Sequence, residues 1–276
     1  MNDLAAAISR CHVKDAFMGA DGKEMDILYV DDEHFMHEPF RMMMETMACA
    51  AVESVSSGME AIQALASRRY DAVVSDYQMP GMNGIELLKN VRARGSNVPF
   101  ILFTGRGREE VAIDAINNGA DYYLQKGMDP MSQFTELTHM IRRAVEERRE
   151  RENLRMTSQR LEALVNNMHD AVAMFDLELK VLYVNPAFER ILGWSGQEII
   201  GMKAPWVPEE ELGVIKDRLM EIARTGKSVH YDGSRRSKDG KTFDFHISMA
   251  PITDPDGRVN TISAIGTLIE PKKKVD

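Results

Sequence analysis

The sequence predicts two domains of different fold class: a doubly wound α/β domain with a five-stranded parallel sheet, and an α+β domain with an antiparallel sheet. Short apolar runs alternate with helical stretches between residues 26 and 130, whereas several strand-like runs and a turn dominate residues 169–270. No Pro or Gly interrupts residues 131–168, which predicts one long helix between the domains. Strand–helix alternation is typical of a parallel sheet covered by helices.

The composition bounds the class of protein. The chain has 276 residues, 44% hydrophobic and 28% charged, with a formal net charge of -9. Acidic chains rarely bind nucleic-acid backbones, and no apolar run approaches the ~20 residues of a membrane span. The two cysteines, Cys11 and Cys49, form no metal or disulfide pattern, and the N-terminus has too short an apolar core for a signal peptide. We expect a cytoplasmic protein with no membrane and no direct nucleic-acid partner.

The first domain is expected at residues 26–130, after an N-terminal extension, 1–25, that has no clear period. Four of its five expected strands are marked by apolar runs: "DILYVD" (26–31), "DAVVSD" (71–76), "PFILFT" (99–104) and "DYYLQK" (121–126). Helical stretches are expected at 33–47, 58–69, 84–95 and 109–120. The continuous apolar strands indicate burial on both faces of the sheet.

Residues 131–168 are predicted to form the last helix of the first domain and a connecting helix. Apolar and small residues step by four and three along its distal part, which is the spacing of a coiled-coil seam: Leu154, Ser158, Leu161, Val165 and Met168. The middle, "EERRERE", offers Glu147–Arg151 and Arg148–Glu152 pairs one helical turn apart. The seam favours a homodimer.

The second domain is expected at residues 169–270, followed by a tail, 271–276. Predicted strands are "AVAMFD" (171–176), "KVLYVN" (180–185), "SVHYDGSRR" (228–236), "TFDFHISMAPI" (242–252) and "VNTISAIGTLI" (259–269), with helices between the second and third. "DPDGR" (254–258) separates the last two strands and is typical of a hairpin turn.

Polar side chains stand where the strands of the first domain end. The first strand ends on Asp31 and Asp32, and the others on Asp76, Thr104 and Lys126. The carboxyl ends of parallel strands meet at one edge of the sheet, so we expect three carboxylates, a hydroxyl and an ammonium together. Such a carboxylate group favours Mg²⁺, and one carboxylate could act as a nucleophile toward a phosphoryl group. The Pro-Gly turn after Asp76 would fix a backbone carbonyl toward the metal.

These motifs together resemble the receiver domain of response regulators, the CheY-like fold. "VDDE", "DYQMPGMNG", "LFTG" and "GADYYLQK" follow the family's order over residues 26 to about 145. The resemblance implies that Asp76 is the phosphoacceptor. It also implies that Mg²⁺ is bound directly by Asp32, Asp76 and the main-chain carbonyl of Gln78, and by Asp31 through water.

The resemblance implies further roles around the phosphoryl group. Thr104 and Lys126 would hold its oxygens, and Tyr123 would be the switch aromatic. The sequence departs from the family at Gly127, where a proline after a cis bond is usual. A non-proline cis bond costs about 2.5–4 kcal/mol, so we expect a trans bond and a differently shaped loop after Lys126.

The second domain resembles a PAS domain through "YVNPAFERILGWSGQEIIGM" and "SRRSKDGKTFDFHISMAPITDPDGRV". This resemblance covers roughly 160–270 and implies a sensor or dimerisation module. The second half has no cysteine, and no histidine occurs between His169 and His230. A flavin photosensor of this class needs a reactive cysteine, and a haem sensor of the usual PAS type needs an axial histidine on its long helix. We therefore expect neither flavin nor haem, and the sequence does not identify a PAS ligand.

The sequence thus predicts a response regulator that accepts a phosphoryl group from a histidine kinase on Asp76. It would signal through the connecting helix and the PAS domain to a protein partner, with no activity beyond self-phosphotransfer and autodephosphorylation. Because the sequence runs only to residue 276, we expect no DNA-binding domain. The receiver–PAS combination resembles archaeal regulators of methanogens. The alternative is a phosphohydrolase resembling haloacid dehalogenases, although Gln78 stands where that family has a second Asp.

Overall fold

A computed structural model describes residues 25–269 except 49, 106–108 and 128. The predicted extension before Met25, the tail 271–276 and both cysteines lie outside the described residues. The chain divides into two compact units between Leu154 and Arg155. In the part of the chain that the structure describes, no helix is both long enough and apolar enough to cross a membrane.

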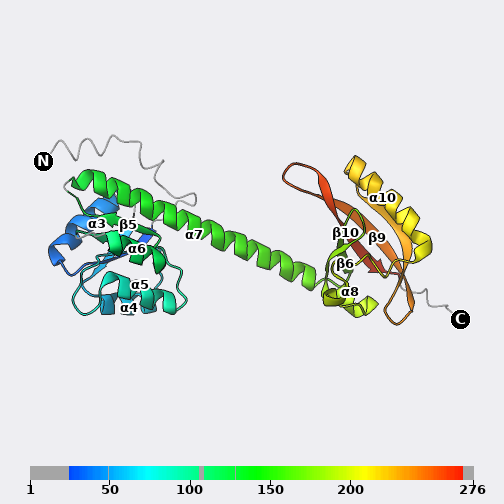
Figure 1. The fold of residues 1–276 in the computed structure, drawn as a ribbon, viewed down its shortest axis with the longest axis horizontal. Helices are drawn as coiled ribbons and strands as arrows, with labels where there is room; N and C mark the ends of the chain where they lie inside the picture. Colours follow the sequence, from blue (N-terminus) through cyan, green and yellow to red (C-terminus); the bar gives the residue numbers. More distant parts are fainter. Residues whose placement is uncertain (1–24, 49, 106–108, 128, 270–276) are drawn as a thin grey trace. The chain divides into compact units, whose positions relative to one another are not determined.

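The first unit is a parallel five-stranded sheet, as predicted (Figure 1). Its strands are β1 (Met25–Val30), β2 (Ala50–Val55), β3 (Ala72–Ser75), β4 (Phe100–Thr104) and β5 (Tyr122–Gln125), in the order β2-β1-β3-β4-β5. The helices are α3 (His34–Ala48), α4 (Gly58–Ser67), α5 (Gly84–Ala93), α6 (Glu109–Asn117) and the first part of α7 (Pro130–Asn166). Strand β2, "AAVESV", is an edge strand that pairs with β1, and most of its residues are half-buried, which explains its weak apolar signal.

The alternation of side chains along β1 builds two cores at once. Ile27 and Tyr29 pack on one face of the sheet with residues of α3 and α7, while Leu28 and Val30 pack on the other face with residues of α4, α5 and α6. All four are fully buried. Complete burial of such side chains stabilises the fold by about 1.5–3 kcal/mol each. The sheet is therefore fixed from both sides, and its strand ends are held in a constant register.

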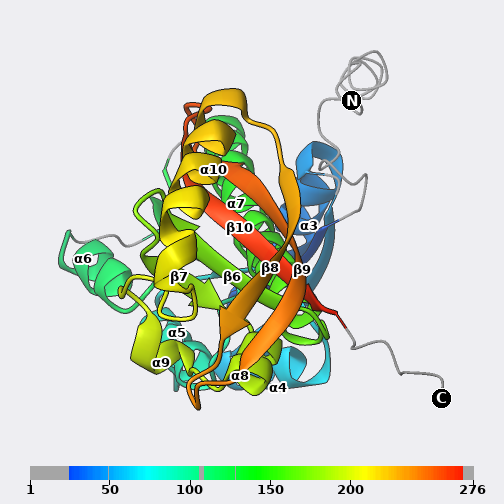
Figure 2. The same ribbon diagram turned by 90° about the vertical axis from the view of Figure 1, so that its right-hand side faces the viewer.

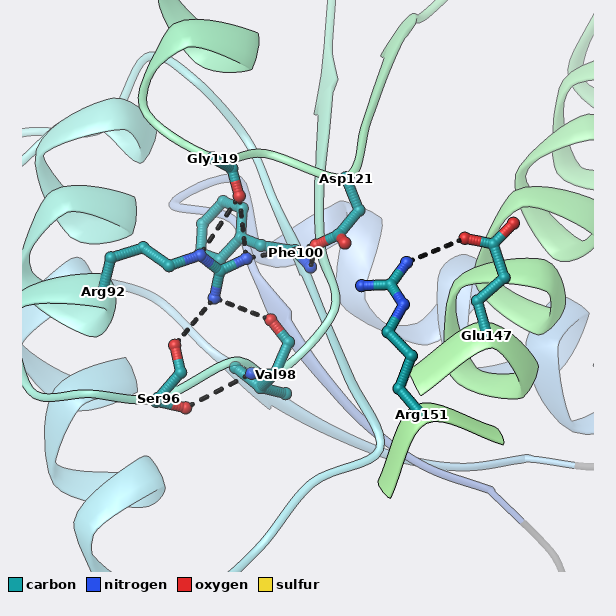
Figure 3. Close-up of polar contacts among 8 residues, drawn as sticks. All are labelled: Arg92, Ser96, Val98, Phe100, Gly119, Asp121, Glu147 and Arg151. Atoms are coloured by element: carbon teal, nitrogen blue, oxygen red, sulfur yellow. Dashed lines mark hydrogen bonds and ion pairs between the residues drawn. The ribbon is translucent and has the colours of Figure 1, made fainter. Parts of the chain in front are cut away.

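Arg92, in the last turn of α5, ties together two loops of the first unit (Figure 3). Its Nη1 donates to the carbonyls of Ser96 at 3.0 Å and Val98 at 2.8 Å. Its Nε and Nη2 donate to the Gly119 carbonyl at 3.1 and 2.9 Å, and Nη2 also reaches Asp121 at 3.1 Å. One side chain thus satisfies three backbone acceptors of the turns that enter β4 and β5.

Helix α7 changes character along its length. Its proximal part packs on the first unit through buried residues: Phe134, Leu137, Ile141, Ala144 and Val145. The predicted pairs are present, Arg151–Glu147 at 3.3 Å and Arg148–Glu152 at 2.8 Å. Residues 150–164 are all exposed, including the seam residues Leu154 (74%) and Leu161 (59%). An isolated helix as short as this exposed stretch is only marginally stable in water, so a partner that covers it would stabilise it.

The second unit is a five-stranded antiparallel sheet covered by helices, as predicted (Figure 2). Its strands are β6 (Ala171–Asp176), β7 (Val181–Val184), β8 (Val229–Arg236), β9 (Thr242–Thr253) and β10 (Val259–Leu268), in the order β7-β6-β10-β9-β8. Between β7 and β8 lie α8 (Pro186–Leu192), α9 (Gly196–Ile199), a 3-10 turn (Glu209–Glu211) and α10 (Leu212–Thr225). Helix α10 lies against β9 and β10.

Asn185 joins the end of α7 to the second sheet. Its Oδ1 accepts from the N–H of Phe188 and of Val172, both at 2.9 Å, so it caps α8 and holds β6. Its amide group donates to the carbonyls of Val165 at 3.1 Å and Asp170 at 3.0 Å. The side chain is fully buried and uses both donors and both acceptor positions, as a buried amide should.

Candidate functional site

The predicted polar residues gather at one edge of the parallel sheet. Asp31 follows β1, Asp76 follows β3, Thr104 ends β4 and Lys126 follows β5. Backbone hydrogen bonds keep these strand ends level: Asp76 N–H donates to the Val30 carbonyl at 2.8 Å, and Lys126 N–H to the Thr104 carbonyl at 2.7 Å. Asp31, Asp76 and Thr104 are all buried. Charged groups at such depth need partners.

Lys126 supplies that partner by bridging two carboxylates. Its Nζ lies 2.8 Å from Asp31 Oδ2 and 3.1 Å from Asp76 Oδ1. Burial raises the pKa of Asp76, and the Lys126 ammonium only partly opposes this. Burial alone would lower the pKa of Lys126, but its hydrogen bonds to Asp31 and Asp76 and their charges outweigh that effect and raise it. The lysine therefore stays charged between the two acids.

Tyr29 is a site residue that the sequence reading missed. Its hydroxyl donates to Asp31 Oδ2 at 2.5 Å, and Glu33 N–H donates to Asp31 Oδ1 at 2.9 Å. Burial, and then the charge of Asp31, raise the pKa of Tyr29, so it remains a hydrogen-bond donor. Tyr29 could have been predicted from its position two residues before Asp31, because residues i and i+2 of a strand share one face.

The turn after Asp76 is built around that carboxylate. Gln78 N–H donates to Asp76 Oδ2 at 2.7 Å, and Gly84 N–H closes the loop by donating to the Tyr77 carbonyl at 2.9 Å. Gly81 has φ +80°, which favours glycine. Asn83 then caps α5 by accepting from the N–H of Ile85 and Glu86, the latter at 2.9 Å. The predicted stiff turn is thus present, and it presents a backbone donor to Asp76.

Gly84 has a steric role in this turn. A Cβ added to it would lie 2.3 Å from the Asp76 carbonyl oxygen and 2.7 Å from Leu102 Cδ1. Neither approach is possible for a real side chain, and the nearer obstacle is backbone. The residue is therefore required because α5 begins directly against the phosphoacceptor candidate, a contact between residues eight positions apart that spacing alone cannot reveal.

The remaining predicted residues lie around this centre. Asp32 is half-buried, and its carboxylate has no hydrogen-bond or ion-pair partner among the described residues. Tyr123 is half-buried, and its hydroxyl is buried without a hydrogen-bond partner within the described part of the chain. Burial raises the pKa of Tyr123. A buried hydroxyl without a partner carries a desolvation penalty, so a conformation that gives the Tyr123 hydroxyl a hydrogen bond would be favoured.

The bond between Lys126 and Gly127 agrees with the expectation from the sequence. No cis peptide occurs in the described residues. Lys126 nevertheless reaches Asp76, and the loop is tied back by Gln133, whose amide donates to the Gln125 carbonyl at 2.6 Å. A glycine at 127 is thus compatible with the bridging position of the lysine.

The donor set suits a hard divalent cation, but it is not arranged as a finished metal site. Asp31 and Asp76 already converge on one positive charge, and oxygen ligands are those that Mg²⁺ prefers. Across the described residues, no three His, Cys, Asp or Glu side chains are grouped so as to hold an ion. The chemistry of the residues fits the cation, and Lys126 lies where it would compete with it.

Comparison with known proteins agrees with this geometry. The family model "Response regulator receiver domain" matches residues 27–141, and the "PAS fold" model matches 159–269. Chemotaxis protein CheY-3 of Vibrio cholerae is 33% identical over 106 residues, which are 38% of this chain and 82% of that protein. The transcriptional regulatory protein FixJ of Azorhizobium caulinodans is 26% identical over 166 residues, 56% of this chain and 78% of that protein.

Among solved structures, the PAS domain of an HTR-like protein from Haloarcula marismortui is 23% identical, with a TM-score of 0.39, covering 44% of this chain and 99% of that one. The parallel sheet, its edge of acids with one lysine and the matched model define a response regulator receiver domain. The chain belongs to that family. In this member the receiver is followed by a PAS domain.

Proposed function

We propose that this chain is a phosphorelay switch in which Asp76 accepts a phosphoryl group from a histidine kinase. The observation that carries the proposal is the Lys126 ammonium held 3.1 Å from Asp76 Oδ1 at the end of a buried strand. In the transfer, a carboxylate oxygen of Asp76 attacks phosphorus, the O–P bond forms and the P–N bond to the kinase histidine breaks. The imidazole leaves as the group that takes up a proton.

The residues around Asp76 divide the work of that transfer. Lys126 neutralises charge on the phosphoryl oxygens, and the Thr104 hydroxyl is the proposed donor to another of them. Asp31, Asp32, Asp76 and the Gln78 carbonyl are the proposed holders of Mg²⁺, with Asp31 acting through water. When bound, the cation supplies charge neutralisation that lets two anions approach each other. Tyr123 is the proposed switch residue, because its buried hydroxyl has no hydrogen-bond partner among the described residues and would gain one by moving when Thr104 moves.

The output is proposed to run through α7. Its exposed stripe carries Leu154 (74% exposed), Leu161 (59%) and Leu164 (67%). Of the predicted seam, Leu154, Ser158 and Leu161 lie on this stretch, whereas Val165 is half-buried and Met168 lies beyond the end of α7. A second copy of the chain is the proposed occupant, since the stripe steps by three and four, as in a two-stranded coil. Phosphorylation would tighten this homodimer, and a protein partner would recognise the result. A net charge of -9 disfavours direct binding to nucleic acid.

The decisive experiment is phosphorylation of the full chain by acetyl phosphate or by a candidate kinase, with Mg²⁺ present. Wild type should acquire an acid-labile phosphoryl group and Asp76→Asn should not. Asp114→Asn, a change to an exposed carboxylate on α6, is the matched control and should label like wild type. Equal labelling of Asp76→Asn and wild type would refute the assignment.

A phosphatase assay separates this proposal from the phosphohydrolase alternative. A response regulator should show only slow loss of its own phosphoryl group, whereas a hydrolase should turn over an added phosphomonoester many times per chain. Gln78 stands where the hydrolase family has its second Asp, and it offers a backbone N–H to Asp76, which favours the regulator. An archaeal, methanogen-type origin remains a proposal from the sequence; the two relatives described above are from bacteria.

A further inference from the structure

Leu179 has the one positive φ among the non-glycine residues that the structure describes. Its φ is +67°, in the left-handed region, which is unfavourable for a side chain that begins with a Cβ. It lies in the short turn between β6 and β7, where a glycine would adopt the same backbone without strain. The turn therefore stores conformational strain at a leucine.

Hydrogen bonds on both sides hold this strained residue. Leu179 N–H donates to the Asp176 carbonyl at 3.1 Å, and the Leu179 carbonyl accepts from Ala204 N–H at 3.0 Å. The Asp176 carboxylate accepts from the N–H of Glu178 at 2.8 Å and Lys180 at 2.9 Å. Strained backbone persists only where its surroundings over-determine it, and four hydrogen bonds do so here.

The conformation delivers the Leu179 side chain into the core of the second unit. The side chain is almost fully buried and lines a pocket of about 50 Å³. The wall is mainly apolar and includes Phe175, Leu192, Trp206, Phe245 and Met249. Its main polar side chains, Arg235 and Tyr231, bond to each other at 2.7 Å, and Arg235 also pairs with Glu211 at 2.9 Å.

We propose that Leu179 is an internal plug, which fills a pocket that would otherwise take a small apolar or aromatic molecule. An apolar cavity of about 150 Å³ is enough to bind benzene or xenon, and 50 Å³ is well short of that. Removing the isobutyl group would enlarge the pocket toward that size. With Leu179 in place the pocket therefore has too little space for a ligand of that size, and such a ligand would compete with Leu179 while relieving the strained turn.

The binding test uses the full chain and benzene as the probe. Methyl resonances of pocket residues such as Ile215 and Ile247 are followed by NMR as benzene is added. We expect no saturable shift in wild type and a saturable shift in Leu179→Gly and Leu179→Ala. Saturable binding to wild type as tight as to the variants, or no binding to either variant, overturns the plug.

The strain is tested by the order of thermal midpoints. At an ordinary helical position glycine is less stable than alanine, and Leu192, which lines the same pocket from α8, provides that control pair. At position 179 the order should be inverted, with Leu179→Gly melting above Leu179→Ala, while Leu192→Gly melts below Leu192→Ala. The usual order at 179, or failure of Leu179→Gly to fold while Leu179→Ala folds, overturns the proposal. If both variants fail to fold, that result also counts against it, because relief of strain should keep the glycine variant folded.

Discussion

Gly84 lies against the main-chain carbonyl of Asp76 so closely that a Cβ on Gly84 would be 2.3 Å from that oxygen. Helix α5 therefore begins in direct contact with the residue that is proposed to carry the phosphoryl group. The contact makes the position of Asp76 depend on the packing of a whole helix, because the same added Cβ would also lie 2.7 Å from Leu102 Cδ1 of β4.

Gly84→Ala should destabilise the receiver domain and slow phosphorylation of Asp76. Overpacking of this kind costs about 1–3 kcal/mol, since backbone has to shift to admit the methyl group. Urea unfolding and the rate of labelling by acetyl phosphate measure the two effects. Gly213→Ala is the control, because a Cβ there meets no atom within 4 Å on α10. Unchanged stability and labelling of Gly84→Ala would show that the turn between Asp76 and Gly84 can shift to admit the methyl group at no cost.

Asp76→Asn should unfold at a higher urea concentration than wild type at pH 7. The folded-state pKa of Asp76 is raised above 3.8, so the folded chain binds a proton more tightly than the unfolded chain. The stability that Asp76 contributes is present below pH 3.8 and is lost as the pH rises through the folded pKa. The advantage of the variant should therefore grow with pH across that window.

Urea titrations at several pH values, with Asp114→Asn as an exposed control, measure this difference. A variant that is less stable than wild type at pH 7, with the gap closing on acidification, would mean that attraction to Lys126 outweighs burial.

Asp32→Ala should weaken Mg²⁺ binding far more than Thr104→Ala. Loss of a residue that merely supports a metal ligand weakens binding about 10–100-fold, so loss of a ligand should cost at least tenfold. Thr104 is proposed to touch only the phosphoryl group, and its replacement should leave Mg²⁺ affinity nearly unchanged. Calorimetric titration of the unphosphorylated chain with MgCl₂ gives both constants, and equal losses would contradict the assigned roles.

Leu161→Glu should shift the chain toward monomer. The change places a charge on the exposed seam of α7, where apolar contact with a second copy is proposed. Phosphorylation should tighten the wild-type dimer by a coupling of about 1–3 kcal/mol. Sedimentation velocity before and after acetyl phosphate treatment measures both effects. Gln159→Glu adds the same charge roughly opposite on the helix and should leave the dimer intact.

An identical oligomeric state for Leu161→Glu and wild type, with and without phosphorylation, would exclude the seam. The antiparallel sheet of the second unit would then be the next surface to test.

Arg92→Met should destabilise the first unit by about 2–4 kcal/mol, because it leaves several backbone acceptors without their donor. The affected carbonyls are those of Ser96, Val98 and Gly119 (Figure 3). Arg94→Met, two residues along at the exposed end of α5, should change stability by less than about 0.5 kcal/mol. Thermal unfolding of both variants decides the matter, and equal midpoints would mean that water replaces the guanidinium at no cost.

The sequence predicted most of the fold because its strands are continuous apolar runs and its turns carry Pro, Gly or Asn. Every predicted strand lies within a residue or two of its observed bounds. The edge strand β2 has a weaker pattern, since Glu53 interrupts its apolar residues and much of the strand is half-buried. Local periodicity reports burial, and an edge strand is buried too little to stand out.

The site residues at strand ends could be predicted from the sequence, whereas those that act through packing contacts could not. Asp31, Asp76 and Lys126 were placed by parallel topology alone, and the structure brings them together. The hydrogen bond from Tyr29 and the steric demand on Gly84 needed coordinates, because both depend on distances across the fold. The roles of Asp32, Thr104 and Tyr123 remain predictions that the experiments above test.

The exposed stretch 150–164 of α7 has a practical consequence for anyone building hybrid sensors from this chain. No residue in it is buried, so the helix can be cut and rejoined there without opening a core. Each added residue turns an α-helix by about 100°, and a heptad drifts by only about 20° from a perfect repeat. Fusions that lengthen or shorten the stretch by seven should therefore keep the apolar stripe in phase, whereas changes of two or five would turn it to roughly the opposite side of the helix. The phase of the apolar stripe, and with it the output of a fusion, should therefore vary with linker length with a period of one heptad.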